Sequence, residues 1–373
     1  MESNVTIVGA GVIGLAIASE ISERKEKIFL LERNRTFGQE TSSRNSEVIH
    51  SGIYYPRGTL KARLCVEGRN LLYKLCVEKE IPYRKCGKLI VATHKDEIAK
   101  LEEVKQKGEA NGVDDLRYVE GQELKDLEPN VKAVKALFFP STGIIDSYSL
   151  MKYLESNAKR NGTEFAYGVN VTGIEKIKNG YRVNIHDADE QPFSFTTKIL
   201  INSAGLEADI IAKSIGINQK EYNIYFWKGE YFYVGSGKNR LIKRLVYPVP
   251  EEYNIGLGIH ATIDLSGRLR LGPNTEFIPE KKIDYSVKKE NQQAFFESAR
   301  KFLPFLEYED LGPDMAGIRP KLQKPGDPVK DFIIREESGK GYPGLINLLG
   351  IESPGLTACL SIGKYVVSLL NRI

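Results

Sequence analysis

The sequence predicts an α/β fold of two interleaved parts, one built around a nucleotide-binding sheet and the other around an antiparallel sheet. A glycine-rich turn directly follows a β-branched run near the N-terminus. Further on, segments rich in aromatic and β-branched residues are separated by Gly and Pro turns. The 373 residues, 41% hydrophobic and 27% charged, suffice for two or three domains, which excludes a disordered chain or a small disulfide scaffold.

The first forty residues predict a β-α-β unit. Residues 5–8 are typical of a buried parallel strand, and residues 9–14 match the GxGxxG pattern. Apolar residues over 15–21 recur at helical spacing, and a second strand over 27–31 ends in Glu32. This order of elements is typical of a Rossmann-like dinucleotide-binding unit.

Each glycine of the pattern has a physical role. Gly9 permits the tight turn, Gly11 lets the backbone approach a pyrophosphate at the helix N-terminus, and Gly14 lets the helix pack close to the strand. Glu32 lies where a carboxylate accepts hydrogen bonds from a ribose 2′-hydroxyl, which disfavours a 2′-phosphate. The unit alone does not distinguish NAD from FAD, because the ADP part of both cofactors is bound in the same way.

A polar loop over residues 33–46 follows the second strand. It is crowded with hydroxyls and amides, which can bind a second phosphate and a sugar chain, although a solvated surface loop has the same composition. A strand-like run then carries His50 toward a Gly-Ile-Tyr-Tyr-Pro turn.

Several stretches resemble a known family. Residues 45–55, 60–68 and 86–92 closely resemble the L-2-hydroxyglutarate dehydrogenase/oxidase family, within the D-amino-acid-oxidase-like flavoproteins. The resemblance continues, in matching order, at residues 201–206, 247–250, 257–260, 271–274 and 317–320. It therefore spans almost the whole chain.

The resemblance implies FAD as the cofactor and assigns residues to each part of it. It implies Gly9, Gly11 and Gly14 at the pyrophosphate, Glu32 at the ribose, Arg33 near the adenine edge, Thr41, Ser42 and Ser43 along the inner phosphate and ribityl chain, Val171 at the adenine, Ala204 and Gly205 over the nucleotide, and Gly355, Leu356 and Thr357 at the flavin carbonyl edge. A helix N-terminus at that edge would stabilise an anionic reduced flavin. No cysteine occupies a flavin-linking position by resemblance, so we expect noncovalent FAD.

The motif order divides the chain into two discontinuous domains. We expect a Rossmann-like FAD-binding domain over residues 1–87, 144–220 and 313–373, and an antiparallel-sheet substrate domain over 88–143 and 221–312. The first should contain a helix over 148–159, strands over 163–174 and 198–202, a hairpin at Asn179-Gly180 and a helix over 356–370. The second should contain strands over 222–226, 230–234, 245–247 and 255–259, then a helix over 291–302.

Oxidation of a 2-hydroxy acid needs a cation for the substrate carboxylate and a base for the hydroxyl proton. Arg319 is the candidate cation, because a guanidinium binds a carboxylate in bidentate fashion; an ion pair between the domains is the alternative. Of four histidines, His50 and His260 lie in family-like runs, and either is a candidate base. Tyr247 and Asn274 are weaker candidates for polar contacts to the substrate.

The resemblance implies oxidation of a 2-hydroxy acid by hydride transfer to flavin N5, foremost of L-2-hydroxyglutarate to 2-oxoglutarate. An amino-acid oxidase of the glycine/sarcosine type would use the same fold and the same arginine. A nonenzymatic nucleotide-binding or redox-sensing protein would bind FAD without substrate reduction. The electron acceptor is left open among oxygen, a quinone and a protein.

Charge and cysteine content exclude other classes of partner. The 53 basic residues barely exceed the 49 acidic ones and form no extended basic run, so nucleic acid is not indicated. The four cysteines form no CxxC pair and no cluster of zinc spacing, so we expect no metal site. The short lead before the first strand and the lack of a long apolar stretch predict a cytoplasmic chain without a transmembrane helix, with quinone reduction placing it at the inner face of the membrane. The sequence does not indicate an oligomeric state.

Overall fold

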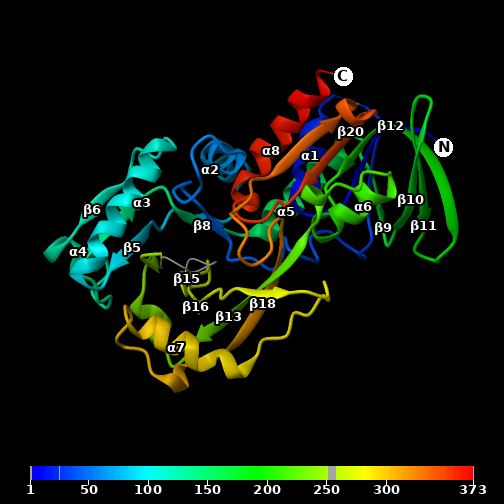
Figure 1. The fold of residues 1–373 in the computed structure, drawn as a ribbon. Coiled ribbons are helices and arrows are strands. Elements are labelled where there is room, and N and C mark those ends of the chain that lie inside the picture. The colour runs from blue at the N-terminus through cyan, green and yellow to red at the C-terminus, as the bar shows by residue number, and fades with distance from the viewer. Residues whose placement is uncertain (1, 25, 251–257, 373) are drawn as a thin grey trace.

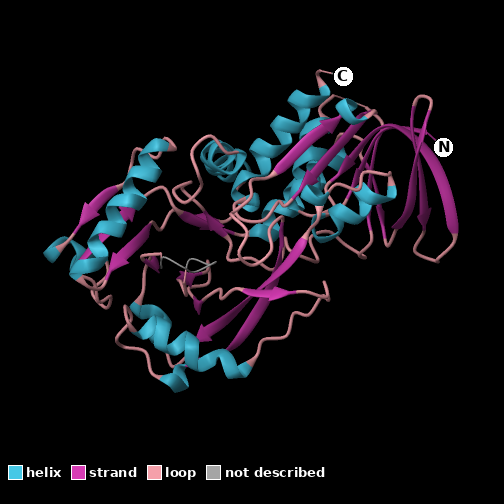
Figure 2. Cartoon of the chain, viewed as in Figure 1, coloured by secondary structure: helices cyan, strands magenta, loops and turns pink. Residues whose placement is uncertain are grey.

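The computed structural model describes residues 2–24, 26–250 and 258–372. Figure 1 shows two bodies: one carries β1, β12 and β20 with α1 and α8, and the other carries β5, β13 and β18. Figure 2 shows the same arrangement by secondary structure, with long helices over the first sheet. The predicted α/β class is confirmed.

The first sheet has eight strands and a parallel centre. Its order is β10-β11-β12-β1-β2-β9, and β20 joins β12 while β19 joins β20. The pairs β12–β1, β1–β2, β2–β9 and β12–β20 are parallel. The strands are β1 (Glu2–Val8), β2 (Ile28–Glu32), β9 (Glu164–Tyr167), β10 (Asn170–Ile177), β11 (Gly180–His186), β12 (Pro192–Asn202), β19 (Ile333–Glu337) and β20 (Tyr342–Leu349).

Five helices accompany this sheet, and their apolar faces form its core. They are α1 (Val12–Ser22), α2 (Leu60–Lys79), α5 (Ser147–Arg160), α6 (Ala208–Ser214) and α8 (Gly355–Leu370). One hydrophobic cluster contains Ile7 of β1, Ile17 of α1 and Ile362 of α8, all fully buried. The C-terminal helix therefore packs against the first helix, as Figure 1 shows.

The second sheet has nine strands and is mostly antiparallel. Its order is β17-β13-β16-β15-β14-β5-β7-β6, and β18 pairs with β13. The strands are β5 (Lys88–Ala92), β6 (Arg117–Val119), β7 (Lys135–Phe139), β13 (Tyr225–Val234), β14 (Leu245–Pro248), β15 (Ala261–Ile263), β16 (Leu269–Leu271), β17 (Glu276–Ile278) and β18 (Leu311–Lys321). The helices α3 (Ile98–Ala110), α4 (Gly121–Leu127) and α7 (Gln292–Arg300) lie in the same segments.

One pair departs from the expected antiparallel pattern. The strands β14 and β5 run parallel, with Val246 opposite Leu89. Residues 93–244 separate them in the chain, so no hairpin forces them to be antiparallel.

A three-stranded sheet joins the remaining strands, in the order β3-β8-β4. They are β3 (Val48–Ile49), β4 (Tyr83–Arg84) and β8 (Gly143–Ile145). Short 3-10 turns complete the elements: Lys95–Glu97, Gly205–Glu207, Lys220–Tyr222, Lys238–Leu241, Lys289–Asn291, Tyr308–Asp310 and Ser338–Lys340.

Several elements differ from expectation. The two strands expected over 222–226 and 230–234 form the single strand β13, and β18 carries the second sheet to Lys321, beyond residue 312. The helices α2 and α3 were not anticipated. Most of the strand expected over 255–259 lies outside the described residues. The division into two domains stays a prediction.

No helix in the described part of the chain is both long and apolar enough to cross a membrane.

Candidate functional site

A cavity of about 720 Å³ is lined by residues of both large sheets. Its lining includes the glycine-rich turn and Glu32, and also His50, His260 and Arg319. The chain segments that we expected to bind a cofactor and a substrate therefore share one continuous space.

The glycine-rich turn forms the cavity wall at the start of α1. Gly9 has φ +102°, and a Cβ there would lie 2.7 Å from the Ser203 carbonyl oxygen. At Gly14 a Cβ would lie 1.9 Å from the Gly9 carbonyl oxygen, so this residue is required for packing and does not itself line the cavity. Gly11 lines the cavity, and the Val12 N–H donates to Ser42 Oγ at 2.9 Å. The N-terminus of α1 thus faces the cavity with its positive dipole end.

Glu32 holds this turn in place from the end of β2. Its Oε2 accepts from the Ala10 N–H at 2.7 Å, and its Oε1 accepts from the Asn34 N–H at 2.9 Å. Arg33, which also lines the cavity, pairs with Glu40 and Glu207. Both side chains are therefore fixed at the end that we expected to bind the adenosine.

The remaining residues predicted at the cofactor fall into two groups. Thr41, Ser42, Val171, Ala204, Gly205, Gly355 and Leu356 line the cavity, and Ser43 and Thr357 do not. Ser43 is exposed and donates to the Glu40 carbonyl oxygen at 3.2 Å. Thr357 is buried; its hydroxyl donates to the Val48 carbonyl oxygen and accepts from the His50 N–H at 3.0 Å. It therefore ties the start of α8 to the segment that carries His50.

His50 lies just after β3 on the cavity wall. Burial, and secondly the nearby Lys88 ammonium, lower the pKa of His50 to about 3. Its Nε2 lies 3.4 Å from Ser353 Oγ, on the loop before α8. At neutral pH the imidazole is neutral and so can accept a proton.

His260 lies opposite, on the second sheet. It is 6% exposed, and its ring stacks on that of Tyr247 with centroids 3.6 Å apart. Both rings line the cavity. The residues predicted as a catalytic histidine and a substrate contact are thus one stacked unit.

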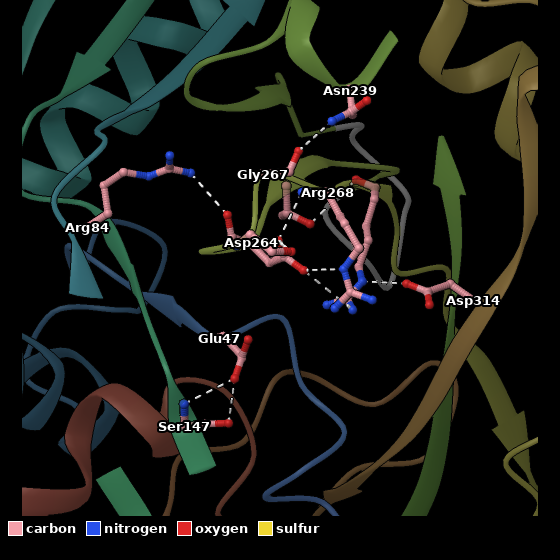
Figure 3. Close-up of polar contacts among 11 residues, drawn as sticks. Glu47, Arg84, Ser147, Asn239, Asp264, Gly267, Arg268 and Asp314 are labelled. Carbon is pink, nitrogen blue, oxygen red and sulfur yellow. Dashed lines mark hydrogen bonds and ion pairs between the residues drawn. The ribbon is translucent and has the colours of Figure 1, made fainter. Parts of the chain in front are cut away.

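A polar network braces the hairpin that follows His260, and Figure 3 shows it. Asp264 Oδ1 accepts from the Ser266 and Arg268 N–H groups, each at 2.9 Å, and Arg84 donates to the Asp264 carbonyl oxygen at 3.1 Å. Burial would raise the pKa of the Asp264 carboxyl, but hydrogen bonds from the Ser266 hydroxyl and from the backbone and side chain of Arg268 lower it. Arg270 forms an ion pair with Asp314, which ties β16 to β18.

Figure 3 also shows how the loop before β3 is held. Glu47 has φ +57°, a conformation unusual for a residue with a side chain. Its carboxylate accepts from the Ser147 hydroxyl at 2.7 Å and from the Ser147 N–H at 3.1 Å. The start of α5 therefore fixes the backbone just before His50.

Arg319 lies on β18 with its guanidinium over Gly229. A Cβ at Gly229 would lie 2.6 Å from Arg319 Nη2, so the glycine leaves room for this group. Nη2 donates to the Asn274 carbonyl oxygen at 3.3 Å, and the buried Nη1 has no hydrogen-bond partner among the described residues. The Asn274 side chain bonds Glu230 and does not line the cavity.

Several charged residues at the site were not anticipated, among them Lys61, Lys88, Lys321 and Glu352. Lys61 and Lys321 line the cavity with Glu352, and Lys61 Nζ lies 2.8 Å from Glu352 Oε1. Lys88 is fully buried, and its Nζ, which has no hydrogen-bond partner in the described part, lies 4.9 Å from the ring centroids of Tyr54 and Tyr247. Of these four, only Lys321 could have been inferred from the position of Arg319. It lies two residues later on the same strand, so both side chains lie on one face of the sheet.

The cavity fits FAD. The glycine turn and the N-terminus of α1 would hold the pyrophosphate, because Gly9, Gly11 and Val12 line the cavity where the helix presents its N-terminal N–H groups and positive dipole end. Glu32 would lie at the ribose, and Gly355 and Leu356 at the N-terminus of α8 would lie at the flavin. The histidines and Arg319 would then face the reacting end.

Comparisons with known proteins agree with this geometry. The family described as DAO, FAD dependent oxidoreductase, matches residues 4–369. The mitochondrial L-2-hydroxyglutarate dehydrogenase of Arabidopsis thaliana is 39% identical, over 99% of this chain and 83% of that protein. A glycerol 3-phosphate dehydrogenase of Caloramator mitchellensis is 32% identical, over 99% of this chain and 74% of that protein.

Among solved structures, the dithionite-reduced L-alpha-glycerophosphate oxidase of Mycoplasma pneumoniae, with FAD bound, has a TM-score of 0.86 and 30% identity. It is matched over 100% of this chain and 95% of that chain. The chain belongs to the DAO family of FAD-dependent oxidoreductases, and FAD is its cofactor.

Proposed function

We propose that this enzyme oxidises L-2-hydroxyglutarate to 2-oxoglutarate. One observation carries the proposal: the buried Arg319 Nη1, without a partner among the described residues, lies in the same cavity as His50, His260 and the FAD cradle. A carboxylate would satisfy this group. The name of the Arabidopsis relative, which matches almost the whole chain, supports the choice of acid.

The side chains divide the work. Arg319 binds a carboxylate and so orients the hydroxyl-bearing carbon, and His50 accepts the hydroxyl proton on Nε2 because it is neutral. FAD supplies the two-electron oxidant that takes up the hydride from the substrate carbon. The products are the 2-oxo acid and reduced cofactor, with the proton on His50. His260 fixes Tyr247 against the substrate, and Asn274 holds Arg319 through its carbonyl oxygen.

Oxidation of glycerol 3-phosphate is the second candidate function. The Caloramator relative and the Mycoplasma oxidase both carry names for that substrate at 30% identity or more. Its phosphate would bind Arg319 as a carboxylate does, and it too carries a secondary hydroxyl. The amino-acid alternative would need only one acid group at the site.

Anaerobic reduction of the bound flavin tests these substrates directly. L-2-hydroxyglutarate should bleach the visible flavin absorbance of the holoenzyme, while D-2-hydroxyglutarate, glycine and sarcosine should not. Bleaching by glycerol 3-phosphate alone would replace the proposal with the second candidate. Bound FAD that no substrate in the panel reduces would contradict both.

We also propose that FAD is bound noncovalently and that a quinone accepts the electrons. The enzyme would then lie in the cytoplasm, at the inner face of the membrane. Acid precipitation should release the flavin into the supernatant, and flavin retained in the pellet would contradict noncovalent binding. Turnover with a quinone analogue should exceed turnover with oxygen. The reverse order would make the protein an oxidase.

A further inference from the structure

We propose that Lys321 binds the second acid group of the substrate, beside Arg319, and so determines specificity for a dianion. This inference rests on the proposed function, because it takes the substrate to be a hydroxy acid with a second acid group.

The first support is strand geometry. Arg319 and Lys321 are two residues apart on β18, so both side chains lie on the same face of the sheet. Both line the cavity. Along a strand such residues are about 7 Å apart.

The second support is the direction in which both side chains lean. On β13, Gly229 pairs with Gly317 and Trp227 pairs with Arg319. The Arg319 guanidinium lies over Gly229, and Lys321 Nζ lies 5.2 Å from the Trp227 ring centroid. Lys321 itself pairs with Tyr225, so each side chain leans two pairs along the ladder in the same direction, which keeps the two cationic groups apart and facing the same space.

The third support is the charge balance. Three cations, Lys61, Lys321 and Arg319, surround the single carboxylate of Glu352 and, against its burial, lower its pKa. Lys61 already forms the direct ion pair with Glu352, at 2.8 Å. Among the described residues, neither Arg319 nor Lys321 has a carboxylate within ion-pair distance.

Burial leaves Lys321 in need of an anion. The side chain is 9% exposed, and burial lowers the pKa of its ammonium. A substrate carboxylate would restore the lost electrostatic stabilisation. The terminal carboxyl carbons of a five-carbon dicarboxylate are about 5 Å apart. Two cations about 7 Å apart on one strand can therefore contact both ends of one molecule.

The test compares ligands with one and two acid groups on the Lys321→Met holoenzyme. Glutarate and valerate are probes that lack the reacting hydroxyl, and calorimetric titration gives their Kd. Wild type should bind glutarate more tightly than valerate. In the variant, glutarate binding should weaken by about 10- to 100-fold while valerate binding stays within threefold, because one charge-assisted contact is lost.

Kinetics provide a second measurement. In Lys321→Met the KM for L-2-hydroxyglutarate should rise by a similar factor with kcat within about threefold, and Lys321→Arg should restore most of the affinity. Lys324→Met is the matched control, because Lys324 is exposed and does not line the cavity. It should change neither ligand's Kd.

The possible outcomes separate this proposal from the proposed function. Equal loss of glutarate and valerate binding in Lys321→Met, unchanged glutarate binding, or a wild type without preference for glutarate would each overturn the role of Lys321. If no 2-hydroxy acid reduces the wild-type flavin, the proposed function fails, and the glutarate titration still decides the role of Lys321.

Discussion

Tyr247 and His260 stack face to face, with ring centroids 3.6 Å apart and ring planes within 6° of each other. The pair is buried on the second sheet and forms part of the cavity wall. In this arrangement the ring at position 260 supports one face of Tyr247.

The stack predicts how His260 variants behave. His260→Phe should keep the stacked ring and lower kcat/KM by less than about tenfold, whereas His260→Ala should lose more, because Tyr247 loses its support. Steady-state kinetics with L-2-hydroxyglutarate provide the check. A loss of a hundredfold or more in His260→Phe would instead identify His260 as the base.

His50 should behave differently. His50→Asn removes the proton acceptor and should lower kcat/KM by about 10²- to 10⁴-fold with the flavin still bound. Because the pKa of His50 is about 3, protonation should inactivate the wild type only well below pH 6.5. A pH profile of kcat/KM measures this, and a wild-type acid limb near pH 6.5 would contradict the neutral buried imidazole.

Lys88 should destabilise the protein at neutral pH. Burial lowers the pKa of Lys88 from 10.5 to about 7, so the unfolded chain holds a proton that the folded chain gives up between these values. The contribution of Lys88 to the free energy of unfolding is therefore most unfavourable at and below pH 7, and this penalty disappears as the pH rises. Lys88→Met should be more stable than wild type at pH 7 by roughly 3–5 kcal/mol.

Urea denaturation of the two holoproteins at several pH values tests this prediction. The advantage of Lys88→Met should shrink as the pH approaches 10. If the difference in unfolding free energy between Lys88→Met and wild type grew with pH, the destabilising effect of the buried ammonium would be contradicted. The same variant should raise the pKa of His50 and move the acid limb of kcat/KM to higher pH, because a nearby positive charge is gone.

The glycine turn predicts a graded pair of variants. Gly14→Ala should abolish FAD binding or folding, because its Cβ would meet the Gly9 carbonyl oxygen at 1.9 Å. Gly11→Ala should be milder, because its Cβ would lie 3.0 Å from the hydroxyl of Ser42, a side chain that can rotate. The flavin-to-protein absorbance ratio after purification measures both. If Gly14→Ala retained as much FAD as Gly11→Ala, with both variants still loaded, Gly14 would not be required for packing.

Arg319 should contribute mainly to substrate binding. Arg319→Ala should raise the KM for L-2-hydroxyglutarate at least 30-fold, because a buried charged contact is worth 2 kcal/mol or more. Arg319→Lys should recover only part of this, since a lysine cannot bind a carboxylate in bidentate fashion. An unchanged KM in both variants would leave the arginine as a purely structural contact to Asn274.

Local features of the site could be predicted from the sequence, and long-range pairings could not. The roles of Gly9 and Gly14 depend on a few neighbouring residues, so the GxGxxG pattern is enough to predict them. The contact between Lys61 and Glu352 joins residues 291 positions apart, and no periodicity reports such a pair. The buried position of Lys88 depends on the parallel pairing of β5 with β14. These strands are not joined by a hairpin, so the local sequence does not predict the pairing.

Helix α2 was missed for a different reason. Its N-terminus has a clear signal, because the Thr59 side chain accepts from the Ala62 N–H. The family-like residues 60–68 lie within this helix, and a resemblance of that kind does not by itself indicate secondary structure. Strand β18 was not predicted. It contains Pro313 and Pro320, a residue type that sheets usually hold only at edges, strand starts or bulges.

The packing of α1 against α8 has a consequence for biosynthesis. Gly9 and Gly355 line the same cavity, and the first helix is covered by the last. A growing polypeptide on the ribosome can form the initial β-α-β unit, but it cannot enclose a flavin until α8 has been synthesised. Cofactor loading therefore follows the synthesis of both the first and the last element of the cavity wall.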